Sequence, residues 1–465
     1  ILLLLVLLAI SPGIPPWTTF SEFSVKPPLP LSGALAPNEI LDGAKRLFEG
    51  EIGGPESIAW RRTDEIFVGI SDGTIQKIHG ESFSQISKVT QMGEACDKPY
   101  KKKSGRPLGM RFAPNGRLLV ADAFYGIYSV DVDTGEKECL VSPDDLIEGK
   151  PFKFPDDVDI DAENNIYWSD ASTIADFTDG LLEFMSDPTG RLVKYDSQTK
   201  TNTVLMDKIH FANGVQLSPN QDFILLSETA RSRVHRYWLK GPKTGQSEIF
   251  IDQLPGSPDN IRPRPDGGYY ISLCGTKNAD NLDEIETADK INRHPMFRKI
   301  ICRIFACIQL TCNTLNKLIP YSILEEISHK IFSFDILINA LKDYLTIVVE
   351  VDENGNIIGS LQGSTGKVRL ISETAHVGDN IFFGTPYMNF LGHLYVGGDK
   401  ERKIIEKEED IIYDVEIEED SGSLIEDGEG DIIYDVDYEE YNSSIEDMEE
   451  DIYDIENKED SGSSI

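Results

Sequence analysis

Residues 255–263 read Pro255-Gly256-Ser257-Pro258-Asp259-Asn260-Ile261-Arg262-Pro263 and lie between an apolar run, 249–254, and a strand-like segment, 269–273. A carboxylate and an amide held side by side between two prolines are costly to bury unless other groups satisfy them. Similar short loops recur upstream, each ahead of an alternating or apolar segment: Gly54-Pro55-Glu56-Ser57, Arg106-Pro107-Leu108-Gly109, Phe154-Pro155-Asp156-Asp157 and Phe211-Ala212-Asn213-Gly214. We predict that these loops converge on one axis and jointly hold a hard cation.

The loops belong to a longer repeat. Pro55, Pro107, Pro155 and Pro258 mark a period of about 50 residues, with Asn213 filling the gap. Short strand-like segments recur at 65–69, 117–121, 165–169, 223–227, 269–273 and 380–384. A period of roughly 40–50 residues with four short strands is typical of propeller blades. The sequence predicts an all-β fold, a six-bladed β-propeller over residues 41–399. Five repeats are visible up to residue 273, and the sixth runs from about 346 to 398.

The N-terminal segment is apolar and then rich in proline. Residues 1–10, ILLLLVLLAI, are followed by prolines and Trp17. Ten residues are too short to span a bilayer, which needs about 20. We interpret residues 1–17 as part of a signal-anchor or of a signal peptide, both of which lead to the secretory pathway; a buried strand is the alternative. Residues 18–40 are predicted to form a proline-rich stalk.

A segment of a different kind, 281–345, interrupts the repeats. Residues 297–305 and 323–345 show apolar residues at helical spacing, with Lys and Arg between them. This pattern predicts a helical insertion. A basic amphipathic helix can lie on a membrane surface or cap the open face of the propeller, and a helical excursion packed on a blade edge remains an alternative.

The C-terminal segment, 400–465, is acidic and repetitive. The chain has a formal net charge of −36, and residues 401–465 carry 27 acidic and 4 basic side chains, which is −23 of that total. Such a composition cannot bury enough apolar area to fold, so we predict disorder. The tail is interpreted as a solvated spacer, with a basic protein partner as the alternative, and Asn442 is a glycosylation sequon. The lack of a basic stripe argues against nucleic acid.

The six cysteines form no C-x-x-C pair and are too few for a disulfide scaffold. We expect structural thiols, or one disulfide in an oxidising compartment.

Several of these motifs together resemble the strictosidine synthase-like family: 54–59 (GPESIA), 105–110 (GRPLGM), 120–123 (VADA), 213–219 (NGVQLSP) and 256–263 (GSPDNIRP). The resemblance covers about residues 49–398 and leaves out the acidic tail. It implies a six-bladed propeller, often anchored as a single-pass type II membrane glycoprotein.

The resemblance also implies a calcium site. In the related paraoxonase and gluconolactonase propellers, calcium lies in the central channel, and the matching positions here are Glu56, Asn213 and Asp259, with Asn260 adjacent. Asp156 stands where that loop usually carries Asn. Carboxylate and amide oxygens are the ligands that Ca²⁺ takes, six to eight in all. In the alternative interpretation each residue caps its own turn.

Catalysis would follow from such a site. The resemblance makes Asp259 the first candidate for a nucleophile or base, and His376 a second candidate base, although a lone histidine is often structural. The histidine pair of the paraoxonases is replaced by Leu108 and Ala123.

The catalytic glutamate of true strictosidine synthases falls near Ser372, with Glu373 beside it, so alkaloid condensation is not expected. Two functions remain. One is a calcium-dependent hydrolase of arylesterase type acting on a small ester or lactone. The other is a non-catalytic surface propeller that binds glycans or proteins, with calcium purely structural.

Overall fold

The computed structural model describes residues 10–94, 104–277, 287, 289–319, 322–334 and 345–397. The chain divides into two units, 1–401 and 402–465. The predictions for residues 1–9, for the acidic tail and for Asn442 fall outside the described residues and stay predictions.

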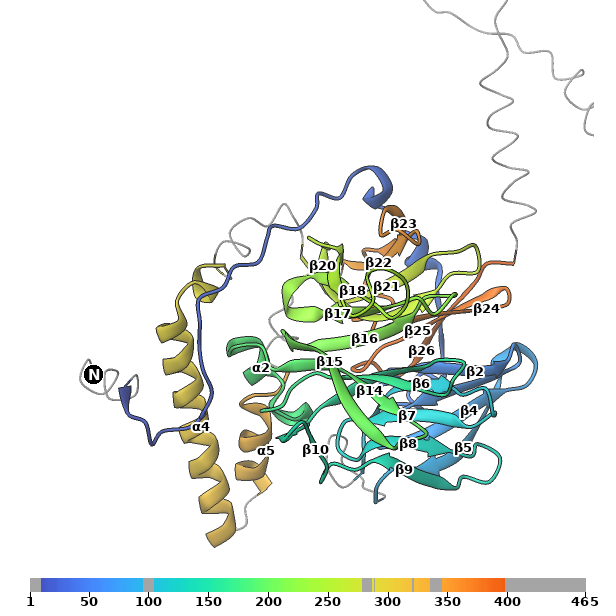
Figure 1. Ribbon diagram of the computed structural model, residues 1–465. Coiled ribbons are helices and arrows are strands. Elements are labelled where there is room, and N and C mark those ends of the chain that lie inside the picture. The colour runs from blue at the N-terminus through green and yellow to red at the C-terminus, as the bar shows by residue number, and fades with distance from the viewer. Residues whose placement is uncertain are drawn as a thin grey trace, which may run out of the picture. The chain divides into compact units, whose positions relative to one another are not determined.

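The described part is an all-β propeller of six four-stranded blades, as predicted (Figure 1). Blade one is β2 (Ile58–Arg62), β3 (Glu65–Gly69), β4 (Thr74–His79) and β5 (Gln85–Gln91). Blade two is β6 (Pro107–Phe112), β7 (Leu118–Asp122), β8 (Gly126–Val130) and β9 (Lys137–Val141). Blade three is β12 (Pro155–Ile160), β13 (Ile166–Asp170), β14 (Gly190–Asp196) and β15 (Thr201–Ile209).

Blade four is β16 (Ala212–Leu217), β17 (Phe223–Glu228), β18 (Arg233–Trp238) and β19 (Ser247–Ile251). Blade five is β20 (Gly256–Pro263), β21 (Tyr269–Thr276), β22 (Thr346–Val351) and β23 (Ile357–Gly363). Blade six is β24 (Glu373–Val377), β25 (Asn380–Gly384) and β26 (Leu391–Tyr395), completed by β1 (Lys45–Leu47). A two-stranded sheet, β10 (Leu146–Ile147) with β11 (Lys150–Pro151), precedes blade three.

The first strand of each blade contacts the first strand of the next, and the ring closes where β24 meets β2. The strand-like segments recognised in the sequence are the second strands of the blades. Every residue of β17, for example, is buried. A strand covered on both faces is a continuous apolar run, which is why this position gives the strongest signal.

Closure of the ring departs from the predicted sixth repeat. β1 pairs with β26 in antiparallel register, Lys45 opposite His393 and Leu47 opposite Leu391. Blade six therefore takes its outer strand from the beginning of the propeller. The segment taken as one repeat from 346 to 398 instead contains the last two strands of blade five and the first three of blade six.

The helical insertion lies inside blade five, between β21 and β22, rather than between two blades. It contains α4 (Pro295–Leu318) and α5 (Ser322–Lys330), which pack on each other beside the propeller (Figure 1). Blade three carries a short helix, α2 (Leu181–Met185), which contacts α4.

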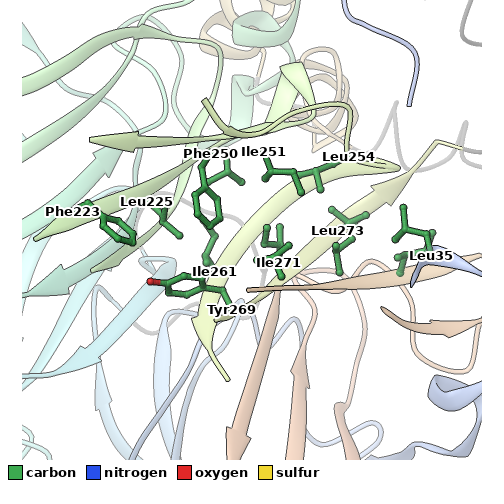
Figure 2. Close-up of a cluster of buried hydrophobic side chains, with 14 residues drawn as sticks. Leu35, Phe223, Leu225, Phe250, Ile251, Leu254, Ile261, Tyr269, Ile271 and Leu273 are labelled. Carbon is green, nitrogen blue, oxygen red and sulfur yellow. The ribbon is translucent and has the colours of Figure 1, made fainter. Parts of the chain in front are cut away.

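Apolar side chains between neighbouring blades form the core. Figure 2 shows the cluster between blades four and five, which includes Phe250, Ile261 and Tyr269, with Leu35 at its edge. Leu35 lies in a 3₁₀ turn, Gly33–Leu35, and is buried there. The backbone N–H of Leu29 donates to the carbonyl of Gln253 at 2.8 Å. Residues 29–35 therefore pack on the propeller, and the predicted stalk was wrong for this part of the segment.

Candidate metal site

Each of the five predicted metal ligands lies in the first strand of a blade or just before it, and Asp259 and Asn260 are in the middle of theirs. Glu56 precedes β2, Asp156 is in β12, Asn213 is in β16, and Asp259 and Asn260 are in β20. Each is buried, with no more than 5% of its surface exposed. Segments far apart in sequence therefore bury polar side chains along the inner strands.

Bulges interrupt the strand pairing at four of these residues. The pairing register shifts between Pro155 and Val158, between Ala212 and Val215, and between Pro258 and Ile261. A bulge takes residues out of the hydrogen-bonded ladder and redirects their side chains. In these three blades the residues released from pairing include the candidate ligands.

Glycines in the same motifs bring neighbouring blades close. A Cβ on Gly109 would lie 2.4 Å from the Cα of Asp157, and one on Gly214 would lie 2.4 Å from the carbonyl oxygen of Asp259. A Cβ on Gly384 would lie 2.2 Å from the carbonyl oxygen of Glu56. Since any side chain would push the backbones apart, glycine at these positions sets the spacing of the ligand-bearing loops.

The candidate ligands are linked to one another. The amide nitrogen of Asn260 lies 3.4 Å from Oε1 of Glu56, and Asn213 hydrogen-bonds to Asp259. Four of the ligands carry a buried oxygen without a hydrogen-bond partner: Glu56 Oε2, Asn213 Oδ1, Asp259 Oδ1 and Asn260 Oδ1. Buried polar atoms of a native protein normally have partners, so this group of exceptions requires an explanation.

The chemistry of this set fits a hard cation, because all four atoms are carboxylate or amide oxygens. No group of three or more His, Cys, Asp or Glu side chains in the described part of the chain is arranged to hold a metal. An ion here would therefore draw on the two amides as well as on the carboxylates.

The electrostatics of the site oppose three bare carboxylates. Burial, the carboxylate of Asp259 and that of Asp156 raise the pKa of Glu56. Burial and the neighbouring acids likewise raise the pKa of Asp156. The pKa of Asp259 rises to about 7, mainly because of burial, although hydrogen bonds from Cys274 and Asn213 oppose the rise. A bound cation would favour the charged forms and relieve this repulsion.

Arg106 supplies positive charge next to these acids and was not predicted. It is fully buried, its Nη1 donates to the carbonyl of Gly54 at 2.9 Å and its Nη2 to that of Pro386 at 3.3 Å. Its guanidinium acts to lower the pKa of both Glu56 and Asp156. It thus ties blade two to the loop that carries Glu56.

A second buried cluster, also not predicted, joins the inner strands. Arg262 donates to Asp157 through both Nη1 (2.8 Å) and Nη2 (3.1 Å), and its Nη2 donates to Glu373 at 2.5 Å. All three side chains are fully buried. Glu373 also accepts from the hydroxyl of Ser57 at 2.9 Å, and Asp157 accepts from the backbone N–H of Val215 at 2.8 Å. Side chains and backbone groups of blades three, four, five and six, with the residue just before blade one, meet here.

Other predicted positions lie elsewhere or carry apolar groups. The Nδ1 of His376 is 3.1 Å from the hydroxyl of Tyr270, and the structure does not bring His376 into the ligand cluster. Leu108 and Ala123 belong to a buried apolar cluster with Phe154 and other phenylalanines.

The hydroxyl of Ser372 donates to the carbonyl of Glu56 at 2.9 Å.

Five cysteines are described, and all are free thiols: Cys139, Cys274, Cys302, Cys307 and Cys312. Among the described residues, no helix is long and apolar enough to cross a bilayer.

Comparison with known proteins agrees with these motifs. The sequence model of strictosidine synthase matches residues 156–242, and that of the strictosidine synthase-like N-terminal region matches 33–78. The chain is 36% identical over 396 residues to the adipocyte plasma membrane-associated protein Hemomucin of Drosophila melanogaster, covering 83% of this chain and 67% of the relative. It is 33% identical over 402 residues to the adipocyte plasma membrane-associated protein of Salmo salar, covering 85% and 84%.

Among solved structures, a gluconolactonase from Xanthomonas campestris aligns with 83% of this chain and 98% of its own, at 14% identity and a TM-score of 0.48. A likeness at that level carries no conclusion on function.

Proposed function

This chain belongs to the strictosidine synthase-like family, together with the adipocyte plasma membrane-associated proteins and Hemomucin, and from that premise we propose that it is a calcium-dependent hydrolase of small esters or lactones. The activity would be of the weak arylesterase type. The observation that carries the proposal is the group of four buried oxygens without partners on residues in, or just before, the inner strands. Their number and type match part of the oxygen shell that Ca²⁺ requires.

The residues of the site would bind the ion, and one of them would also take part in catalysis. Glu56, Asn213, Asp259 and Asn260 would hold the ion, with Asp156 adding a third carboxylate. When bound, Ca²⁺ would polarise the substrate carbonyl and stabilise the developing oxyanion. Asp259 is also the candidate proton acceptor, because a bound cation would hold its buried carboxyl group in the charged form.

Condensation of the strictosidine synthase type is not supported by these residues. The position near the catalytic glutamate of that enzyme is Ser372, whose hydroxyl is bonded to the backbone of Glu56. The adjacent Glu373 is held by Arg262 at 2.5 Å.

A second candidate is a non-catalytic propeller that binds glycans or proteins and uses calcium structurally. The observation in its favour is the apolar environment of Leu108 and Ala123, where the paraoxonases carry a histidine pair. The same ion site would then only lock the inner strands together.

The relatives are named as plasma membrane-associated proteins. We propose that this chain is membrane-associated through residues 1–17, as a single-pass type II protein with its propeller lumenal or extracellular, or secreted if that segment is removed. Surface biotinylation of cells that express the full chain, compared with recovery from the medium, separates these two outcomes.

The test of the hydrolase is phenyl acetate turnover by the full chain, with and without a calcium chelator. We expect turnover that is lost on chelation, restored by Ca²⁺ and abolished in Asp259→Ala. Asp64→Ala, a change at an exposed aspartate of a blade-one turn, is the matched control and should leave turnover unchanged.

Calcium binding is measured in parallel by calorimetry and by the melting temperature with and without chelator. Binding without turnover would establish the second candidate, whereas absence of both binding and a melting shift would refute the ion site itself.

A further inference from the structure

A cluster of phenylalanine rings packs against the segments that lead into two of the candidate ligands. Phe154 and Phe211 are buried in it. Phe154 stands two residues before Asp156 in blade three. Phe211 stands two residues before Asn213 in blade four. The two ring centroids are 5.2 Å apart in the edge-to-face arrangement that aromatic pairs prefer, so one pair of rings holds the backbone ahead of both ligands.

Phe177 extends this cluster to the buried cation of the candidate site. Its ring centroid lies 5.7 Å from that of Phe154. The guanidinium of Arg106 lies over the other ring, 5.5 Å from the centroid of Phe177. Because Arg106 acts on the charges of Glu56 and Asp156, the cluster contacts the electrostatic partner of the ligands as well as their backbone.

Among the described residues of the insertion, Phe334 is the one that joins this cluster. It follows α5, is half-buried, and its ring centroid lies 5.6 Å from that of Phe211 and 5.8 Å from that of Phe184. A Cβ on Gly180 would lie 2.1 Å from Cζ of Phe334. The ring therefore fits directly against the backbone of the loop between β13 and β14.

Hydrogen bonds fix the insertion to the same loop on both sides of Gly180. The side-chain amide of Gln309 on α4 donates to the carboxylate of Asp179 at 2.8 Å. The backbone N–H of Leu181 donates to the carbonyl of Phe332 at 3.0 Å. A displacement of the insertion would therefore carry this loop with it, together with the two rings of the cluster that the loop bears.

We propose that the helical insertion positions the ion-binding segments of blades three and four through Phe334, so that docking of the insertion and binding of the ion favour each other. Phe334 acts through Phe211 and is thus a positioning residue. Close-packed interiors leave little free volume, so the loss of one ring lets its neighbours relax. This inference rests on the ion site of the proposed function, but it holds for the hydrolase and for the non-catalytic alternative alike.

The first test is calorimetric titration of the full chain with Ca²⁺. Phe334→Ala should weaken calcium binding about tenfold, which is within the range typical of coupling between sites, and Phe334→Leu should recover most of the affinity. Phe305→Ala is the matched control, because Phe305 is a half-buried ring of the insertion that packs in a different cluster, 5.7 Å from Phe332. Both alanine variants should lower the urea midpoint, but only Phe334→Ala should change the calcium affinity.

Gly180→Ala tests the same contact from the other side. The backbone of Gly180 is helical, with φ of −55° and ψ of −29°, so alanine is compatible with it. The three atoms nearest to the new Cβ would all belong to the ring of Phe334. Gly180→Ala should therefore weaken calcium binding in the native chain and have no further effect in Phe334→Ala.

A coupling between two sites is reciprocal, so calcium should also stabilise the docked insertion. Saturating Ca²⁺ should slow hydrogen exchange of residues 322–334 about fivefold in the native chain and leave it unchanged in Phe334→Ala. Equal calcium affinities of Phe334→Ala and Phe305→Ala, with calcium bound by the native chain, would overturn the positioning role and leave the proposed function intact. Absence of calcium binding by the native chain would overturn the ion site, and the coupling with it.

Discussion

Replacing Arg262 by methionine tests whether the buried ion pairs hold the inner strands together. The change removes the guanidinium that contacts Asp157 at 2.8 Å and Glu373 at 2.5 Å, in a place where all three side chains have no exposed surface. Two carboxylates then remain buried without that cation. Breaking a buried pair by removing one partner costs about 3–5 kcal/mol, so we expect a loss of that size in the free energy of unfolding.

The assay is urea unfolding of the full chain followed by tryptophan fluorescence. Lys243→Met is the matched control, because Lys243 pairs with Glu248 at 2.8 Å on the surface and the lysine is 53% exposed. Exposed pairs contribute about 0–1 kcal/mol. If Arg262→Met costs no more than the control, the reasoning is refuted.

A rescue variant distinguishes lost charge balance from lost packing. Adding Asp157→Asn and Glu373→Gln to Arg262→Met removes both unpaired charges. The new amides keep an oxygen that can accept from Val215 and from Ser57. Because neutral replacement of a whole buried ionic group is often tolerated, the triple variant should recover at least half of the loss.

Three further predictions address the site and its scaffold. Gly214→Ala should lower both the urea midpoint and the calcium affinity, because the new Cβ would lie 2.4 Å from the carbonyl oxygen of Asp259. Gly43→Ala is the control and should change neither, because the nearest atom to its Cβ would be 3.8 Å away. Asp156→Asn should weaken calcium binding about tenfold by removing one carboxylate, with isothermal titration calorimetry as the measurement and unchanged affinity as the contrary result. Hydrogen bonds from Arg61 hold the pKa of Glu65 at about 2, below its ordinary 4.5. That stabilisation is complete above pH 4.5 and is lost as the pH falls toward 2, so Glu65→Gln should flatten the acid limb of the stability curve, and parallel curves would contradict the assignment.

Much of the propeller could be read from the sequence because its second strands are buried on both faces. Residues 223–227 and 380–384 were recognised from their apolar runs; β17 (Phe223–Glu228) extends one residue further, and β25 (Asn380–Gly384) has the same bounds. The closing strand β1 gave no such signal. It has three residues, Lys45–Leu47, and two of them are exposed and basic. Pairing with β26, at the opposite end of the propeller sequence, is a tertiary event that no local pattern encodes.

The position of the insertion within a blade and the packing of the proline-rich segment were both missed in the sequence, for related reasons. An insertion between β21 and β22 leaves the strand pattern on each side intact, so sequence alone does not reveal whether it divides a blade or separates two. Prolines at 27, 28 and 30 suggest an extended spacer. Extended backbone can equally lie along a surface, and here Leu29 and Leu35 bury apolar side chains against blades four and five.

For the candidate site, sequence motifs identified the polar segments, but they did not predict which charged side chains pair with each other. The polar loops were found because Asp, Asn and Gly next to Pro violate the apolar pattern of an inner strand. The sequence did not show which groups each charge contacts. Asp156 and Asp157 are adjacent in sequence, but Asp156 lies with the candidate metal ligands and Asp157 pairs with Arg262. A bulge makes this possible by releasing successive residues from strict alternation.

Charge balance connects the two clusters to the proposed chemistry. If Glu56, Asp156 and Asp259 were all ionised, they would bring three negative charges to one buried site, and Arg106 brings one positive charge, so a divalent ion would cancel the other two. Arg106 thereby offsets part of the charge of both Glu56 and Asp156. Arg262 forms ion pairs with Asp157 and Glu373, so these two carboxylates would not compete for the ion. The unpaired oxygens are thus those that a cation would need, and the paired ones are those that hold the ring of strands around it.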